Sequence, residues 1–386
     1  MNGDKPADGT KLQNREVLLG DLDRLRSVSD KLGHIHAILQ RQFPPLQRIT
    51  VALHDGRTDL LKTFCSSDLR DNPLRKYAAP LADSPALQEI ARHGQPRVID
   101  DLTAYDSGRP GTKPHIVSEG YRSSYTMPMQ MDGRFAGLLF FDATEPGHFT
   151  ASRLAAVDPF AHLIALTVIR ELAVGRTLYA AIKTARTFAE HRDADTGAHL
   201  DRMSRYARLI ASDLAEVYDL SDEAIEFIYL FAPLHDIGKI GIPDAILLKP
   251  GRLDPDEFEA MKQHVDVGSE IVEEMIEDFG FDQFGNVSIL RNIVHHHHEA
   301  FDGSGYPDGL RGDSIPIEAR IIAVADVFDA LTSRRPYKEA LGNDDALAQM
   351  EVLAGSKLDP QCLAALRRAP EAISRVQEAF AENPIG

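Results

Sequence analysis

The chain has 386 residues, of which 43% are hydrophobic and 26% charged, and its formal net charge is −17 at pH 7. This balance is typical of soluble globular proteins and excludes a fibrous or wholly disordered chain, while the length suffices for two domains. The acidic charge argues against a polymeric nucleic acid as a partner, since nucleic-acid binders usually carry a basic face, and an anionic substrate would need metal ions or local cations.

The chain begins with a polar segment, residues 1–19, which we expect to be flexible and which has no apolar core typical of a secretory signal. Apolar residues then recur every three to four positions, which predicts a helix over residues 14–41. No uninterrupted apolar run approaches the ~20 residues that a membrane span needs. We therefore expect a cytoplasmic protein with no membrane partner.

Five segments of the first half have the composition of β-strands: residues 48–53, 60–65, 97–100, 123–131 and 135–142. Asp132 and Gly133 separate the last two, and this dipeptide favours a tight hairpin turn. A helix capped by Ser84 is predicted over residues 85–93, and a long helix begins near Thr150. A sheet with flanking helices indicates an α+β domain.

This first half resembles GAF domains over residues 20–172. The resemblance is carried by three segments: Ser124-Tyr-Thr-Met-Pro-Met, Gly137-Leu-Leu-Phe-Phe and Phe149-Thr-Ala-Ser. It implies a GAF-like sensor domain, with an antiparallel sheet and flanking helices, that binds an unknown small ligand or mediates dimerisation.

A linker helix is expected at about residues 150–190. It carries an apolar stripe of Leu163, Leu166, Ile169 and Leu172, which Gly175 then interrupts. Such a stripe is typical of a helix that pairs two chains in a homodimer. Packing of the stripe on its own domain explains the pattern equally well.

Residues 173–386 follow helical patterns almost throughout, which predicts an all-α domain. Only two cysteines occur, Cys65 and Cys362, and they form no metal-binding or redox motif. Both are expected to be small buried residues. Eight of the fifteen histidines lie at or after His191, several of them among acidic residues in predicted helices.

Imidazole nitrogen and carboxylate oxygen together suit Fe, Mn or Zn. His235 and Asp236 are adjacent, so the imidazole could hold one metal ion while the carboxylate reaches a second. Asp195 and His199 are four residues apart and could face the same ion, although Asp195 alternatively caps a helix. His264, taken alone, reads as an ordinary helix residue.

His295, His296, His297 and His298 form a run, of which at most two can face one site if they are helical. Asp326 lies in an apolar segment where an unpaired carboxylate would be costly to bury, and metal ligation would remove that cost.

Three ordered motifs resemble the HD-GYP phosphodiesterases, a subset of the HD hydrolases, over about residues 180–369. They are Leu234-His-Asp-Ile-Gly-Lys-Ile, His297-His-Glu-Ala-Phe-Asp-Gly-Ser-Gly-Tyr-Pro307 and Val324-Ala-Asp-Val-Phe-Asp-Ala-Leu-Thr-Ser-Arg-Arg-Pro-Tyr-Lys338. The resemblance implies hydrolysis of cyclic di-GMP to pGpG and further to GMP. It implies the metal ligands His199, His235, Asp236, His264, His297, His298 and Asp326, with Asp236 bridging.

The resemblance leaves open whether two or three divalent ions bind, with Fe or Mn expected and Zn a further option. Members with three metals have Glu where this chain has Asp195, and the shorter side chain either reaches a third ion or leaves that place to water. His191, His295 and His296 have no place in the motif and are expected to be structural or exposed to solvent.

For the substrate, Lys239 is expected to act with Asp236 in catalysis by steadying the attacked phosphate, or else is simply exposed. Arg335 and Lys338 form a cationic pair for phosphate. Tyr306 would stack on a guanine base or contact a phosphate, or else packs in a plain loop.

Asp329 either joins the substrate pocket or pairs with Arg334. Two alternatives to the cyclic di-GMP hydrolase stay open: a catalytically silent receptor for the same dinucleotide, and hydrolysis of another cyclic or linear dinucleotide.

Overall fold

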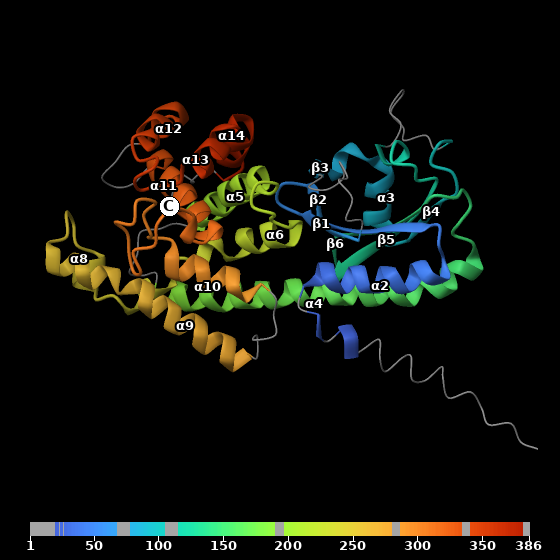
Figure 1. Ribbon diagram of the computed structural model, residues 1–386, viewed down its shortest axis with the longest axis horizontal. Coiled ribbons are helices and arrows are strands. Elements are labelled where there is room, and N and C mark those ends of the chain that lie inside the picture. The colour runs from blue at the N-terminus through green and yellow to red at the C-terminus, as the bar shows by residue number, and fades with distance from the viewer. Residues whose placement is uncertain are drawn as a thin grey trace, which may run out of the picture. The chain divides into compact units, whose positions relative to one another are not determined.

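The computed structural model describes residues 20–22, 24–25, 27–67, 78–104, 115–189, 197–279, 286–333 and 340–380. Contacts divide the chain into two compact units, Met1–Ile169 and Arg170–Gly386 (Figure 1). The expectations for residues 1–19, and for the helix within residues 14–19, lie outside the described residues.

The first unit is built on a six-stranded antiparallel sheet with strand order β3-β2-β1-β6-β5-β4. The strands are β1 (Leu46–Asp55), β2 (Leu60–Ser66), β3 (Ala78–Pro80), β4 (Arg97–Ile99), β5 (Ser123–Met131) and β6 (Arg134–Ala143). All five expected strands are confirmed, and β3 is additional. The expected hairpin is also confirmed, because Asp132 and Gly133 have the positive φ angles, 51° and 73°, that this tight turn requires.

Helices cover both faces of this sheet (Figure 1). They are α2 (Val28–Gln42), α3 (Pro85–His93) and the first part of α4 (Ala151–Ala189), with 3-10 turns η1 (Leu81–Asp83) and η2 (His115–Val117). Ile90 of α3 packs in a cluster with Ala52, Leu61 and Leu138 of the sheet. The Tyr125 hydroxyl of β5 donates to Asp158 of α4 at 2.7 Å, which fixes α4 to the sheet.

Two local expectations are corrected by the structure, and one is met. The helix predicted up to residue 41 is not continuous: Leu25 is not helical, and Ser27 starts α2 by accepting a hydrogen bond from the Asp30 amide. Ser84 occupies the cap position of α3, but its side chain makes no capping hydrogen bond. Helix α4 agrees with the linker helix expected at about residues 150–190 and runs through Gly175, since one glycine costs a helix only about 1 kcal/mol.

Part of α4 resembles a membrane span by length and composition alone. Within the segment Ala151–Thr177, an 18-residue window has a mean hydropathy of 1.4, and 28% of that window is buried. Charged residues such as Asp158 interrupt the segment, so the expectation that no uninterrupted apolar run reaches the length of a membrane span holds for it. Buried Val157, Ile164 and Val168 show that the helix contributes to the core of the first unit.

The described residues of the second unit form helices, turns and loops and no strand apart from one isolated bridge, Ala354 to Leu358, so the all-α expectation is confirmed for them. Its α-helices after α4 are α5 (Gly197–Leu214), α6 (Asp222–Phe231), α7 (Asp244–Leu247), α8 (Pro255–Lys262), α9 (His264–Phe279), α10 (Val287–His296), α11 (Ile317–Thr332), α12 (Asn343–Glu351), α13 (Pro360–Arg367) and α14 (Pro370–Ala379). Three 3-10 turns complete it: η3 (Ala232–Leu234), η4 (Ile237–Gly241) and η6 (Gly312–Ser314).

Helix α5 packs against α6, α11 and α13 at the centre of this unit (Figure 1). The core between them contains fully buried aromatic side chains, among them Tyr206, Phe227, Phe231 and Phe328. Cys65 in the first unit and Cys362 here are both buried free thiols, as expected.

Candidate metal centre

His235 and Asp236 lie between two short turns, η3 and η4, and not within a long helix as expected. The reason is a close backbone contact at Gly238. A Cβ atom there would lie 1.8 Å from the carbonyl oxygen of His264 and 2.4 Å from the amide of Gly268. Only glycine permits this approach, which brings Asp236 next to the first residue of α9.

The four-histidine run is only partly helical. Helix α10 ends at His296, His297 is its C-cap, and His298 lies in the following turn. Because the backbone leaves the helix here, both of the last two imidazoles reach the same place.

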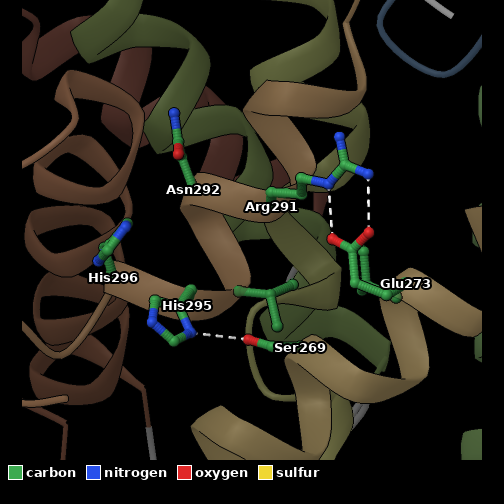
Figure 2. Close-up of a pocket in the computed structure, with 8 residues that line it drawn as sticks. Ser269, Glu273, Arg291, Asn292, His295 and His296 are labelled. Atoms are coloured by element: carbon green, nitrogen blue, oxygen red, sulfur yellow. Dashed lines mark hydrogen bonds and ion pairs between the residues drawn. The ribbon is translucent and has the colours of Figure 1, made fainter. Parts of the chain in front are cut away.

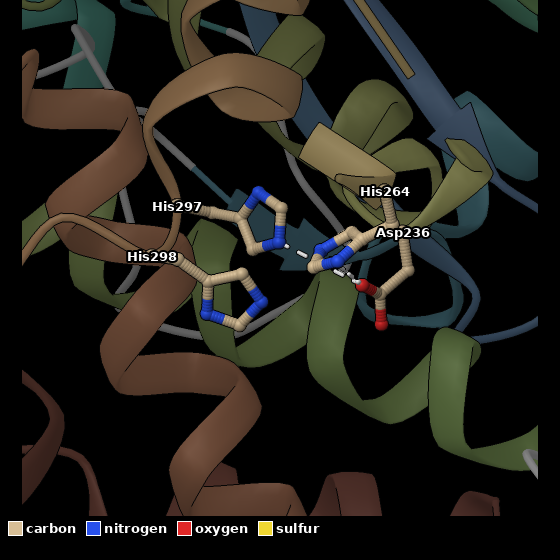
Figure 3. Close-up of side chains that lie close together, drawn as sticks. All are labelled: Asp236, His264, His297 and His298. Atoms are coloured by element: carbon tan, nitrogen blue, oxygen red, sulfur yellow. Dashed lines mark ion pairs between the residues drawn. The ribbon is translucent and has the colours of Figure 1, made fainter. Parts of the chain in front are cut away.

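Asp236 is the centre of a cluster with His264, His297 and His298 (Figure 3). One ligand atom from each of the four residues lies within 4.8 Å of the others. Its Oδ1 atom is 3.4 Å from Nε2 of His264 and 3.7 Å from Nε2 of His297, while Oδ2 is 3.1 Å from Nε2 of His235. The structure thus gathers five of the residues expected to bind metal.

Backbone carbonyl groups orient three of these imidazoles. Nδ1 of His235 lies 2.9 Å from the carbonyl of Ala232, Nδ1 of His264 lies 2.7 Å from that of Met261, and Nδ1 of His297 lies 3.0 Å from that of Ile293. A carbonyl oxygen only accepts, so each Nδ1 carries a proton, and in the neutral imidazole each Nε2 presents a lone pair to the cluster. Ligating histidines in proteins are usually held in this way.

Four atoms of the cluster are buried and have no hydrogen-bond partner among the described residues: Nε2 of His235, His264 and His297, and Oδ1 of Asp236. Leaving a buried polar atom unpaired costs about 1–3 kcal/mol. Four such atoms converging on one place fit a bound metal ion, which would satisfy all of them. The donor set therefore suits the divalent ions expected from the sequence.

Burial and neighbouring charges shift the pKa values of the side chains in the cluster. Burial lowers the pKa of His264 to about 4 and lowers that of His298 well below its ordinary value, so both imidazoles are neutral near pH 7. Burial also opposes a charge on His235, but the neighbouring Asp236 outweighs it and raises the pKa to about 9. Burial raises the pKa of Asp236, yet the positive Lys239 and His235 outweigh this and hold it well below its ordinary value.

His199 and Asp326 form a second part of the site. His199 Nε2 lies 3.7 Å from Oδ1 of Asp326, and its Nδ1 lies 2.6 Å from Oδ2 of Asp329. Asp326 also helps to raise the pKa of His235, so the two parts are coupled electrostatically. Asp326 keeps 32% of its side chain exposed, less buried than its apolar surroundings suggested.

Asp329 is fully buried, and its expected alternative partner Arg334 lies outside the described residues. Its carboxylate accepts hydrogen bonds from His199, from Arg202 at 2.7 and 3.0 Å, and from Ser333 at 2.9 Å. Its role is therefore to orient His199. The buried partner Arg202 was not identified from the sequence, where it is one of several arginines on α5.

The loop after α10 carries Tyr306. Its ring stacks on His298, with ring centres 4.8 Å apart and an interplanar angle of 29°. The buried carboxylate of Glu299 holds this loop by accepting hydrogen bonds from the amides of Asp308 and Leu310, at 2.7 and 3.0 Å. Sequence reasoning missed Glu299, although its place directly after the histidine run was a usable signal.

Lys239 lies 2.7 Å from Oδ2 of Asp236 and keeps 27% of its side chain exposed, at the edge of the cluster. The expectations for Asp195, Arg335 and Lys338 fall on residues outside those that the structure describes.

Comparison with known proteins identifies the two domains. The GAF domain model matches residues 37–168, and the HD domain model matches residues 193–362. The cyclic di-GMP phosphodiesterase response regulator RpfG of Xanthomonas campestris is 49% identical over 187 residues, which cover 48% of this chain and 47% of that protein. A probable cyclic di-GMP phosphodiesterase of Vibrio cholerae is 41% identical over 201 residues, 51% of this chain and 45% of the relative.

A third relative, the 3'3'-cGAMP-specific phosphodiesterase 2 of Vibrio cholerae, is 39% identical over 172 residues, 45% of this chain and 31% of that protein. The chain thus spans less than half the length of each of these relatives. The GAF model matches the first structural unit and the HD model matches the second, in the same order along the chain. The chain contains a GAF domain followed by an HD domain.

Proposed function

We propose that this chain is a metal-dependent phosphodiesterase that hydrolyses cyclic di-GMP to pGpG and further to GMP. The observation that carries the proposal is the convergence of four buried, unpartnered donor atoms around Asp236, beside the exposed edge formed by Lys239. The names of the similar Xanthomonas and Vibrio proteins support the substrate.

The proposed metal ligands share imidazole or carboxylate donors; they are His199, His235, Asp236, His264, His297, His298 and Asp326. This mixture suits Fe, Mn or Zn, with Fe or Mn proposed here, and Asp195 would decide between two ions and three. When bound, such ions lower the pKa of water and neutralise charge on the phosphoryl oxygens.

The chain's own residues would position the substrate. Water adds to phosphorus and loses a proton, while the bond from phosphorus to the 3′ oxygen breaks and that oxygen gains a proton. Lys239, partly exposed beside Asp236, is placed to neutralise the attacked phosphate. Tyr306 would present its ring to a guanine base, and we propose that Arg335 and Lys338 hold the second phosphate.

A second candidate substrate is 3'3'-cGAMP, because a relative with 39% identity over 172 residues is named as specific for it. The two dinucleotides differ in one base, so discrimination would depend on hydrogen bonds to base edges and not on the metal centre.

We also propose that the GAF domain binds a small ligand and regulates the hydrolase, and that α4 pairs two chains in a homodimer. The exposed Leu166, at 66%, beside partly buried Leu163 and Ile169, supports a helix pair. A cytoplasmic location is proposed from the two free thiols, which persist in a reducing compartment.

The test is turnover by the full chain purified anaerobically, with bound metals measured by elemental analysis. We expect metal-dependent conversion of cyclic di-GMP, lost on chelation and in Asp236→Ala, with kcat/KM compared for 3'3'-cGAMP. Binding of cyclic di-GMP without any metal-dependent product would overturn the enzyme and favour a silent receptor.

A further inference from the structure

Three residues outside the proposed catalytic cluster form a second group of potential metal ligands: His295, His296 and Asp308. The two histidines end helix α10, and Asp308 follows the loop that carries Tyr306. Oδ2 of Asp308 lies 3.3 Å from Nε2 of His295 and 3.6 Å from Nδ1 of His296. The three donor atoms all lie within 4.8 Å of one another.

Two contacts of the Ser269 hydroxyl bear on the tautomer of His295. The Ser269 hydroxyl donates its single hydrogen to the carbonyl of Val265 at 2.9 Å. At Nδ1 of His295, 2.8 Å away, it therefore acts as the acceptor, so Nδ1 carries the proton (Figure 2). In a neutral imidazole, Nε2 then presents a lone pair to the carboxylate of Asp308, an arrangement that is repulsive without a cation between them.

The same hydrogen bonds exclude a Ser-His-Asp nucleophile at this place. The hydroxyl proton of Ser269 is already engaged by the carbonyl of Val265, and the serine faces Nδ1 of His295 while the aspartate faces Nε2. A catalytic serine would instead donate to the nitrogen that serves as base.

His296 supplies an independent observation. Its Nδ1 atom is buried and has no hydrogen-bond partner among the described residues, yet it points to the same oxygen of Asp308. Three atoms that can donate an electron pair, Nε2 of His295, Nδ1 of His296 and Oδ2 of Asp308, thus lie close together, and a single hydrogen bond cannot pair all three. A tetrahedral ion with bonds of about 2.0–2.1 Å separates neighbouring donors by roughly 3.3 Å, close to the spacing observed.

We propose that His295, His296 and Asp308 form a separate site for one divalent ion of the Zn²⁺ type. Two imidazoles and one carboxylate leave a fourth position for water. The two histidines also border a hollow of about 190 Å³, lined by Ser269, Asn292 and the paired Arg291 and Glu273 (Figure 2), but not by Asp308. Asp308 is half exposed, so the ion would exchange with the solution.

Occupancy of this site would act on the substrate loop. The ion would join Asp308 to the end of α10, next to His297 and His298. Since Tyr306 lies two residues before Asp308 and stacks on His298, the ion would hold that ring in place. This consequence rests on the proposed function, whereas binding of the ion does not.

The experiment uses the full chain, preloaded at its catalytic centre, and Zn²⁺ as the probe in equilibrium dialysis with elemental analysis. Wild type is expected to bind one Zn²⁺ more than Asp308→Asn and His295→Ala. Asp313→Asn, an exposed carboxylate of the same region, and His162→Ala serve as controls and should bind as wild type. Because Asp308 and His295 are 50% and 32% exposed, both variants should fold.

Hydrogen exchange gives a second readout: Zn²⁺ should slow exchange over residues 303–310 in wild type and not in Asp308→Asn. Equal Zn²⁺ stoichiometry and affinity in wild type and both variants would overturn the site and leave a protonated His–Asp pair. Failure of this site can be distinguished from failure of the proposed hydrolase, because Asp236→Ala should lose the catalytic ions and turnover but still bind one Zn²⁺ at His295, His296 and Asp308.

Discussion

Replacing Asp329 by asparagine tests whether this residue orients His199 or contacts substrate. The carboxylate is fully buried and neutralises the buried Arg202, which donates to it at 2.7 and 3.0 Å. Removing one partner of a buried ion pair costs about 3–5 kcal/mol, because the remaining charge is uncompensated. For a unit of this size that corresponds to roughly 6–20 °C in Tm. Loss of the hydrogen bond to His199 should also weaken metal binding about 10- to 100-fold.

The assay is calorimetric unfolding of the full chain, with metal titrations and steady-state kinetics on the same preparations. Asp313→Asn is the control, since Asp313 also pairs with an arginine, Arg320 at 3.0 Å, but is 85% exposed and should cost at most about 1 kcal/mol. If Asp329→Asn kept its Tm and its metal affinity and only raised KM, Asp329 would be a substrate ligand and the orienting role would be refuted.

The pH dependence of this effect has a definite sign. Burial opposes the charge on Asp329, but hydrogen bonds from His199 and Arg202 outweigh it and lower its pKa from the ordinary 3.8. A carboxyl whose folded pKa is lowered stabilises the fold above its unfolded pKa and loses that contribution as the pH falls through the folded pKa. The difference between wild type and Asp329→Asn should therefore be constant near neutral pH and shrink below about pH 4.

Three further substitutions probe the architecture of the site. Gly238→Ala should destabilise the HD domain by about 1–3 kcal/mol and lower its metal content, because the new Cβ would clash with the backbone of His264. The control is Gly33→Ala, which places its Cβ in open space on α2 and should leave stability unchanged or raise it in the same melting assay. Tyr306→Ala should lower kcat/KM for cyclic di-GMP roughly 5- to 150-fold, because the stacking of the ring on a base is lost. Tyr306→Phe keeps the ring and should retain most of the wild-type kcat/KM. If both variants lowered kcat/KM equally, the ring would not be what binds the base. Glu299→Gln should speed hydrogen exchange of the two loop amides that it binds, and unchanged exchange would contradict its role as their anchor.

Much of the fold was predictable from local patterns. The strand segments, the hairpin at Asp132 and Gly133 and the helical second half follow from hydrophobic periodicity and turn chemistry, which are properties of short segments. The boundaries were less predictable: the helix expected over residues 14–41 is not helical at Leu25, and α2 starts only after its cap Ser27. The apolar character of Ala151–Thr177 was missed because it is a property of the whole helix and not of an unbroken run.

The sequence by itself determined which residue types could bind metal, and the resemblance of its motifs to a known family implied that His235, Asp236, His264, His297 and His298 act together. Only the tertiary structure decided how they meet. The contact at Gly238 joins η4 to α9, and the end of α10 at His296 turns the next two imidazoles toward Asp236. The contact of Asp329 with His199 has the same origin: residues 130 positions apart become neighbours only when α5 and α11 pack, and spacing along the chain carries no record of that contact.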